Sequence, residues 1–254
     1  MSLQLNLSTS RLAQTYTDML IAGDRTAARG MLDKAIADGM SAAILLSDLI
    51  WPVMESIRAL YKDDEITQMQ MNLATRLNRQ MTDQLAAKLP QAPKNGRSVL
   101  IFCGNDEPEE LGGQIAADLF EAAGWSVKFG GGGIANDEIL KMVGDSRPDL
   151  LVMFATLAAG VPHVRKLIDY LKEVNCCPEM QVMCCGGIYQ RAEGLADEIG
   201  ADLYAPDAAE AVIVAESQRS RRANLDQQSV GRTRRIKKAA ERREARGDVR
   251  IEAA

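Results

Sequence analysis

Three carboxylates stand close together in one short segment of the chain, at Glu107, Glu109 and Glu110. They follow an apolar run at residues 99–102 that is typical of a β-strand, and they precede a helix-like pattern at residues 114–123. In α/β proteins the ligand lies at this kind of turn, outside the carboxyl end of a strand. Such carboxylates could bind a hard cation, or they could interact with the N-terminal dipole of the helix as capping, solvated residues. The segment is therefore a candidate ligand loop.

The chain has a single histidine, His163, which follows Gly160-Val-Pro. We expect it in the first turn of a helix at the ligand edge of the sheet. A lone histidine is usually a surface or capping residue, and the alternative is contact with a bound molecule. The pattern singles out no catalytic residue, so the protein is expected not to be an enzyme.

Four of the five cysteines form two adjacent pairs, Cys176-Cys177 and Cys184-Cys185. Adjacent residues of a strand point to opposite faces of the sheet, whereas a tetrahedral metal site needs convergent ligands. We therefore predict small buried side chains and no metal site. The fifth, Cys103, ends the first predicted strand near the ligand loop, and no neighbouring histidine marks it as a nucleophile.

A run of four glycines at residues 130–133 follows the second predicted strand. It does not form Gly-x-Gly-x-x-Gly at the start of a patterned helix, so a dinucleotide site is not expected. The predicted structure is a flexible loop over the edge of the sheet.

Apolar residues recur at helical spacing throughout residues 10–89, which predicts a bundle of four helices. Asp24 and Thr67 are expected to cap the second and fourth helices, and Pro52 is expected to kink the third. Residues 90–97 hold two prolines, an asparagine and a glycine, and are predicted to form a linker.

After the linker, short apolar runs alternate with helix-like segments up to residue 222, which predicts a parallel sheet covered on both faces. The expected strands are residues 99–102, 126–129, 150–154, 182–185 and 202–204. The expected helices are residues 114–123, 136–144, 162–174, 191–199 and 208–222. The predicted fold class is therefore α/β, with an N-terminal helical domain (10–89) and a sheet domain (98–222).

The 254 residues are 46% apolar and only 4% aromatic, which favours helices with small side chains in the core. No apolar run is long enough for a membrane span, and no secretion signal is recognised at the N-terminus. An odd number of cysteines suits reduced thiols in the cytoplasm, so a cytoplasmic protein with no membrane partner is expected.

The net charge of −5 hides a division between an acidic body and a basic tail. Residues 216–254 hold 12 Lys or Arg and 6 Asp or Glu, so this segment carries +6 and the preceding residues carry −11. We expect residues 223–254 to be disordered, since they have few apolar side chains. The tail either solubilises the protein or binds a nucleic acid or an acidic protein.

Several short motifs, taken in order along the chain, resemble the cobalamin-binding family, which includes methionine synthase-type modules, methylamine corrinoid proteins and corrinoid photoreceptor regulators. The matching segments lie at residues 20–24, 32–39, 50–54, 61–67, 73–75, 123–127, 147–149, 186–187 and 199–202. The resemblance implies a helical cap followed by a Rossmann-like, flavodoxin-like domain of five parallel strands.

The functional positions are where this chain departs from the family. The family's ligand loop is Asp-x-His-x-x-Gly, with the histidine on cobalt, and here the positions hold Glu107, Glu109 and Gly112. No histidine ligand to cobalt is therefore expected, and the cofactor stays open: cobalamin bound without one, or none. The groove positions that the resemblance implies are Tyr61, Asn72, Glu107, Glu109, Gly112, Thr156, Gly186 and Gly187.

These departures favour a regulatory or sensory module that has lost the usual corrinoid chemistry and acts through protein contacts, in a setting such as transcriptional control. The alternatives are a corrinoid-carrying subunit of a methyltransferase system, or a binder of another tetrapyrrole in the same groove. A protein partner is expected in each case, and a homo-oligomer is one form of it.

Overall fold

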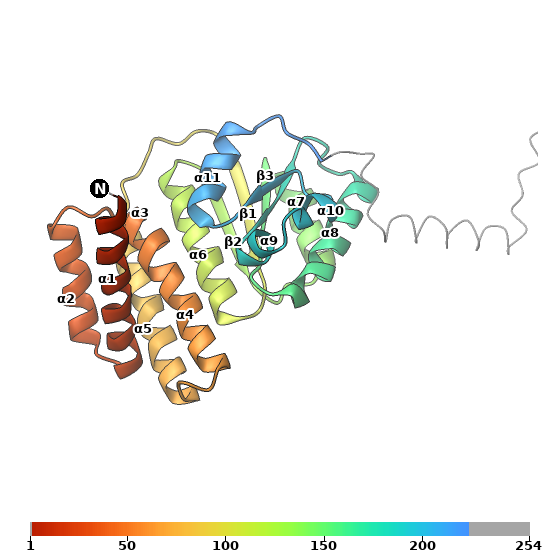
Figure 1. The fold of residues 1–254 in the computed structure, drawn as a ribbon. Helices are drawn as coiled ribbons and strands as arrows, with labels where there is room; N and C mark the ends of the chain where they lie inside the picture. The colour runs from red at the N-terminus through yellow and green to blue at the C-terminus, as the bar shows by residue number, and fades with distance from the viewer. Residues whose placement is uncertain (1, 224–254) are drawn as a thin grey trace, which may run out of the picture.

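The computed structural model describes residues 2–223, as a helical bundle beside a parallel sheet with helices on both faces (Figure 1). Nearly all of the predicted basic tail, at residues 224–254, lies outside the described residues. None of the helices in residues 2–223 is both long and apolar enough to cross a membrane.

The bundle has the four predicted helices, and the third of them contains an irregular turn. The successive elements are α1 (Ser2–Ala22), α2 (Arg25–Ala37), α3 (Ala42–Leu45), the π-helical turn η1 (Leu46–Ile50), α4 (Trp51–Lys62) and α5 (Gln68–Ala86). Because Pro52 has no N–H to donate, the helix loses a backbone hydrogen bond there, and the π turn immediately precedes it. The predicted caps are confirmed: Asp24 accepts from the amide of Ala27, and Thr67 forms a capping box with Gln70.

The sheet has five parallel strands in the order β2-β1-β3-β4-β5. The strands are β1 (Ser98–Cys103), β2 (Ser126–Gly131), β3 (Leu150–Phe154), β4 (Gln181–Cys185) and β5 (Leu203–Ala205). The expectation that every strand is buried on both faces is wrong for β2, which is largely exposed. It has only one neighbouring strand, so it lies at the edge of the sheet.

The helices of the sheet domain follow the predicted alternation with three differences, one of which is that the last helix ends at Ser217 and not at residue 222. They are α6 (Glu107–Ala122), α7 (Asn136–Ser146), the 3-10 turn η2 (Ala158–Gly160), α8 (Val161–Val174), α9 (Gly187–Arg191), α10 (Leu195–Glu198) and α11 (Ala208–Ser217). α6 begins seven residues earlier than predicted, so the candidate ligand loop is partly helical. The helix predicted at residues 191–199 is instead two short helices, separated by a turn at Gly194.

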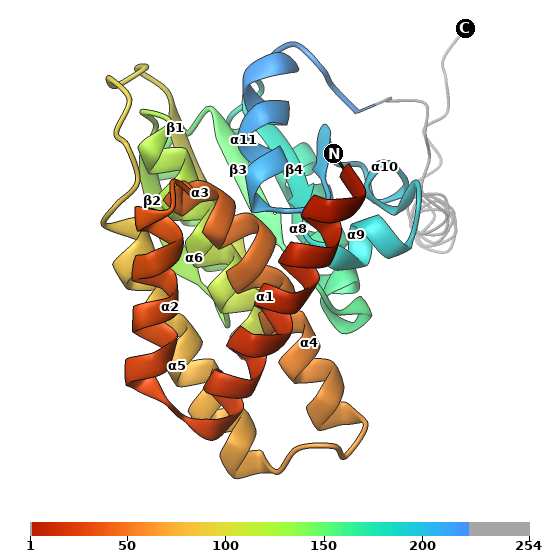
Figure 2. The ribbon, with the colours of Figure 1, turned by 60° about the vertical axis from the view of Figure 1, so that its left-hand side comes forward.

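The residues between α5 and β1 form neither helix nor strand, and they are tied to the end of α6. The amide of Ala92 donates to the carbonyl of Ala122 at 2.8 Å, and the amide of Asn95 donates to the carbonyl of Gly124 at 2.9 Å. The bundle lies beside α6, through α4 and α5 (Figure 2).

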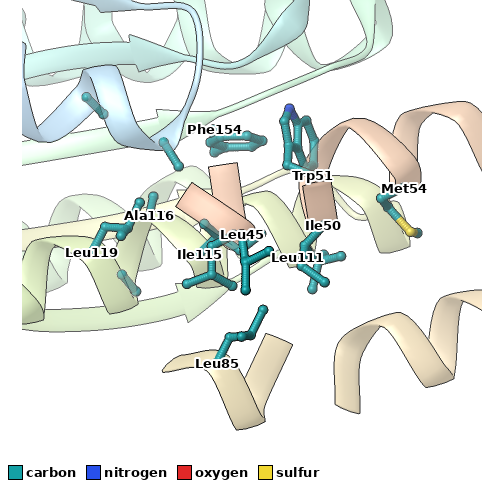
Figure 3. Packing of buried hydrophobic residues seen from close by; sticks show 14 of the residues in the cluster. Leu45, Ile50, Trp51, Met54, Leu85, Leu111, Ile115, Ala116, Leu119 and Phe154 are labelled. Atoms are coloured by element: carbon teal, nitrogen blue, oxygen red, sulfur yellow. The ribbon is translucent and has the colours of Figure 1, made fainter. Parts of the chain in front are cut away.

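The core has two parts, one on each face of the sheet. The larger part is shared by the bundle, α6, α11 and one face of the strands, where Trp51 and Phe154 meet edge to face with ring centres 5.3 Å apart (Figure 3). Cys185 belongs to this part and Cys184 to the other, and both are fully buried. The predicted burial of this pair is confirmed, whereas Cys176 and Cys177 lie half-buried in the turn before β4.

Candidate functional site

A cavity of about 430 Å³ opens at the carboxyl ends of β1 and β3. The chain runs outward from β1 to β2 on one side and to β3 on the other, so this is the topological switch point where α/β sheets bind ligands. Its volume lies within the usual range for small-molecule sites. The wall is mostly apolar, with polar groups from the β1–α6 loop, residues 131–135 and the start of α8.

Glu109 lies on the wall of this cavity and is only 3% exposed. Its Oε1 atom accepts from the backbone amides of Thr156 at 2.7 Å and Leu157 at 2.9 Å, and the Thr156 hydroxyl lies 3.4 Å away. The expectation that this carboxylate is solvated at a helix end is therefore wrong. It bonds to the loop after β3, because those amides have no strand partner and need an acceptor.

The β1–α6 loop passes Glu109 and the glycine run at close range. A Cβ atom on Gly104 would lie 1.7 Å from the Oε2 atom of Glu109, and one on Gly132 would lie 2.3 Å from the carbonyl oxygen of Gly104. Only glycine fits at either position. The glycines at residues 130–133 therefore end β2 and pack closely on the ligand loop, instead of forming the predicted flexible loop.

The neighbouring carboxylates connect the sheet domain to the bundle. Glu107 and Glu110 face Arg79 of α5, at 2.9 and 3.6 Å, and Asp106 lies 3.8 Å from Arg58 of α4. Asp106 is the N-cap residue of α6 but makes no side-chain capping bond. The predicted capping role is therefore replaced by ion pairs across the two domains.

The loops after β3 and β4 meet on the other side of Glu109. Gly186 has φ of 107°, and a Cβ atom there would lie 2.4 Å from the carbonyl oxygen of Ala155. A Cβ atom on Gly187 would lie 2.8 Å from Arg191, whose guanidinium donates to the carbonyl of Thr156. Gly186 therefore lets two backbone segments approach closely, whereas Gly187 leaves room for the side chain of Arg191.

Of the eight expected groove positions, only Glu109 lies on the cavity wall. Tyr61 and Asn72 are both bonded to Gln68 on the far part of α4 and α5, at 2.5 and 3.0 Å. Gly112 lies under the rings of Phe154 and Trp51, where a Cβ atom would come within 2.2 and 2.8 Å of them. The structure thus brings together Glu109, Thr156 and the loop glycines, and leaves Tyr61 and Asn72 apart from them.

His163 lies in the first turn of α8, as predicted, and lines the cavity. Its side chain is exposed, and its backbone carbonyl accepts from Asn136 of α7 at 3.2 Å. Sequence reasoning missed Asn105, Asp106 and Leu157 as wall residues. The switch-point rule could have indicated them, since each follows directly after β1 or β3.

Cys103 is the only cysteine that lines the cavity, and its burial determines its protonation state. Burial, with smaller effects from Glu110 and Glu109, raises the pKa of Cys103 to about 12. The thiol stays protonated at neutral pH and is a poor nucleophile. Within residues 2–223, no three His, Cys, Asp or Glu side chains gather closely enough to hold a metal ion.

The chain thus combines a helical cap with a parallel α/β domain that has a cavity at its switch point. Two family models, both described as B12 binding domain, match residues 12–86 and 97–213. The chain belongs to the B12-binding domain family.

Relatives and solved structures agree with this assignment. The chain is 24% identical over 203 residues to a corrinoid protein of Desulfitobacterium hafniense, covering 77% of this chain and 92% of the relative. It is 26% identical over 126 residues to dimethylamine corrinoid protein 3 of Methanosarcina mazei, a match that covers 49% of this chain and 74% of the relative. The structure of a monomethylamine corrinoid protein of Methanosarcina barkeri has the same fold, with a TM-score of 0.71, 19% identity, and coverage of 81% and 97%.

These relatives correct the main functional expectation. The sequence favoured a regulatory or sensory module, but the relatives are named corrinoid proteins, and two of those described above are named for methylamines. The expectation of transcriptional control is wrong, because it was drawn from missing groove residues and not from any regulatory feature of the chain. The alternative of a corrinoid-carrying subunit agrees better with these findings.

Proposed function

We propose that this protein is a corrinoid-carrying subunit of a methyltransferase system, which works with a protein partner and is not itself the catalyst. The observation that carries the proposal is the cavity of about 430 Å³ at the switch point between β1 and β3, in a chain of the B12-binding family. The names of the relatives support the choice of corrinoid and of methyl transfer.

The wall of the cavity suits a large, mostly apolar group in its composition. Glycines at positions 104 and 132 bring two loops together, and Gly186 brings the loop after β4 against the loop after β3. Apolar side chains, among them Phe102, Met153 and Leu157, line much of the rest. When bound, a corrinoid would supply a cobalt that carries the methyl group.

Position 109, where the resemblance places the cobalt ligand, does not suit a bond between the protein and cobalt. Glu109 stands where the resemblance places a histidine, and its carboxylate already accepts from the backbone of Thr156 and Leu157. A carboxylate oxygen is also a harder ligand than the imidazole nitrogen that late transition metals favour. We therefore derive no step of the reaction through a protein–cobalt bond.

The two domains have separate roles in this proposal. The bundle at residues 10–89 covers one face of the ligand edge, and the domain at residues 98–222 provides the cavity, with residues 90–97 between them. Arg79 and Arg58 hold the bundle against the ligand loop through its carboxylates. A methyltransferase partner would approach the open side of this edge.

Corrinoid retention tests the proposal. The purified full chain is mixed with hydroxocobalamin, desalted, and its corrinoid measured by absorbance, with about one equivalent expected. The blocking variant is Ala159→Trp, because Ala159 is exposed and lines the cavity, and the matched control is Ala158→Trp, its exposed neighbour in η2. We expect at least tenfold weaker retention for the first and no change for the second. Failure of the wild-type chain to retain corrinoid would overturn the proposal.

A further inference from the structure

One oxygen of the Glu109 carboxylate, Oε1, is already in use. Oε1 has two backbone amides within 2.9 Å and the Thr156 hydroxyl at 3.4 Å. Oε2 faces the Cα atom of Gly104, where no side chain would fit. The residue is 97% buried by the protein's own atoms, since only 3% of its surface is exposed. A metal could bind Oε1 only if the loop after β3 lost its acceptor.

This carboxylate also joins two elements that are far apart in the sequence. Glu109 lies in the first turn of α6, and its donors lie 47 and 48 residues later, at the end of β3. The segment that it holds continues through η2 into α8, which carries His163. Glu109 is therefore a positioning residue for one wall of the cavity.

The chain's imidazole, the kind of ligand that cobalt favours, lies on another wall of the same cavity. The chain has one histidine, and it is on α8, with its backbone carbonyl held by Asn136 of α7. Its imidazole belongs to the wall formed by α7 and α8, whereas the ligand loop belongs to β1 and α6.

We infer that Glu109 is a permanent internal anchor of the ligand loop, and that a corrinoid held by this protein takes no cobalt ligand from the chain. The inference rests on the proposed function for its second half only. The first half, the anchor, concerns the protein without cofactor. The two halves of the inference therefore have separate tests.

The first test examines the anchor in the cofactor-free protein by amide hydrogen exchange. In the wild type the Thr156 and Leu157 amides should be protected, and Glu109→Ala should speed their exchange at least tenfold. Glu110→Ala is the control, because Glu110 is in the same turn but faces Arg79, and it should leave both amides unchanged. Glu109→Gln keeps one acceptor oxygen and should give an intermediate rate if the alanine variant fails to fold. Fast exchange in the wild type, or no response to either substitution, would overturn the anchor.

The second test examines the cobalt in the loaded full-length protein, labelled with ¹⁵N. The probes are cob(II)alamin and cob(II)inamide, which lacks a nucleotide base, and the measurement is EPR. We expect no ¹⁵N doublet with either probe. A doublet would contradict the inference, and its loss in His163→Ala would identify the ligand as that imidazole. Absence of corrinoid retention in the wild type would overturn the proposed function and the cobalt half of the inference, while the exchange result would still decide the anchor.

Discussion

The Nε atom of Arg79 on α5 donates to Glu107 in the first turn of α6 over 2.9 Å, and this contact joins the bundle to the ligand loop. The same guanidinium donates to Gln114 at 3.0 Å, and Gln114 donates to Asp83 of α5 at 2.7 Å. The two domains are therefore held together by a short polar network as well as by the shared core.

Replacing Arg79 by alanine should weaken this contact between the domains. The side chains of Arg79 and Glu107 are 30% and 37% exposed, so we expect a loss of roughly 1 kcal/mol in the free energy of unfolding, smaller at high salt. Urea denaturation at low and high salt measures it. Arg76→Ala, one turn earlier and exposed, is the control and should change stability by less than half as much. Equal effects for the two variants would argue against the network.

Gly112→Ala should destabilise the protein strongly, although alanine is the better helix former. The new Cβ atom would lie 2.2 Å from the Phe154 ring and 2.8 Å from Trp51, and both rings are buried. Overpacking of this kind costs about 1–3 kcal/mol. The control is Gly144→Ala in α7, where the added Cβ meets nothing within 4 Å, and where about 0.5–1 kcal/mol of stabilisation is expected. Thermal melting of both variants is the measurement, and opposite signs are the expected result.

Asp118 on α6 should make stability depend on pH. Burial, together with Asp83 and Glu121, raises the pKa of this carboxyl to about 6, and its Oδ2 atom is buried without a hydrogen-bond partner in residues 2–223. Since the folded pKa lies above the unfolded value of about 3.9, the protonated form stabilises the fold at low pH. This stabilisation is lost as the pH rises from about 4 through 6.

The variant that tests this pH dependence is Asp118→Asn, whose side chain stays neutral at every pH. We expect it to be more stable than the wild type at pH 8, by roughly 1 kcal/mol after allowance for solvent screening, and to have no such advantage at pH 4. Urea denaturation across this range measures the difference. The control is Asp145→Asn, at an exposed position of α7. Its difference from the wild type in the free energy of unfolding should not vary with pH. An Asp118→Asn difference that does not vary with pH would contradict the assignment.

The cysteines should divide into two classes of reactivity. Cys184 and Cys185 are fully buried, and burial raises the pKa of Cys184 to about 12, whereas Cys176 and Cys177 lie half-buried in a turn. A disulfide reagent should modify two thiols quickly under native conditions and all five after unfolding. Mass spectrometry identifies the modified residues. Rapid labelling of Cys184 in the native state would show that β4 is more accessible than its burial indicates.

Local patterns in the sequence predicted most of the fold. β3 was predicted at residues 150–154 with its observed bounds, because five apolar residues after Pro148-Asp149 have little alternative to a buried strand. The exposure of β2 could not be predicted in this way, since its position at the edge depends on the order of all five strands.

The candidate site was predicted only in part, for a similar reason. The ligand loop follows β1, and parallel topology alone places it at the carboxyl edge of the sheet. The burial of Glu109 depends on amides that lie 47 and 48 residues further along the chain. No local pattern could reveal that contact, so a capping role was the nearest available interpretation.

The bonds of Glu109 also bear on how this loop could change by single substitutions. Any residue at position 109 that cannot accept from two amides leaves buried donors without partners, at a cost of about 1–3 kcal/mol. Histidine offers one acceptor nitrogen at most, so a substitution to histidine would weaken the fold unless the loop after β3 changed in the same lineage. A histidine at position 109 would therefore keep the stability of this fold only together with at least one compensating change in the loop after β3.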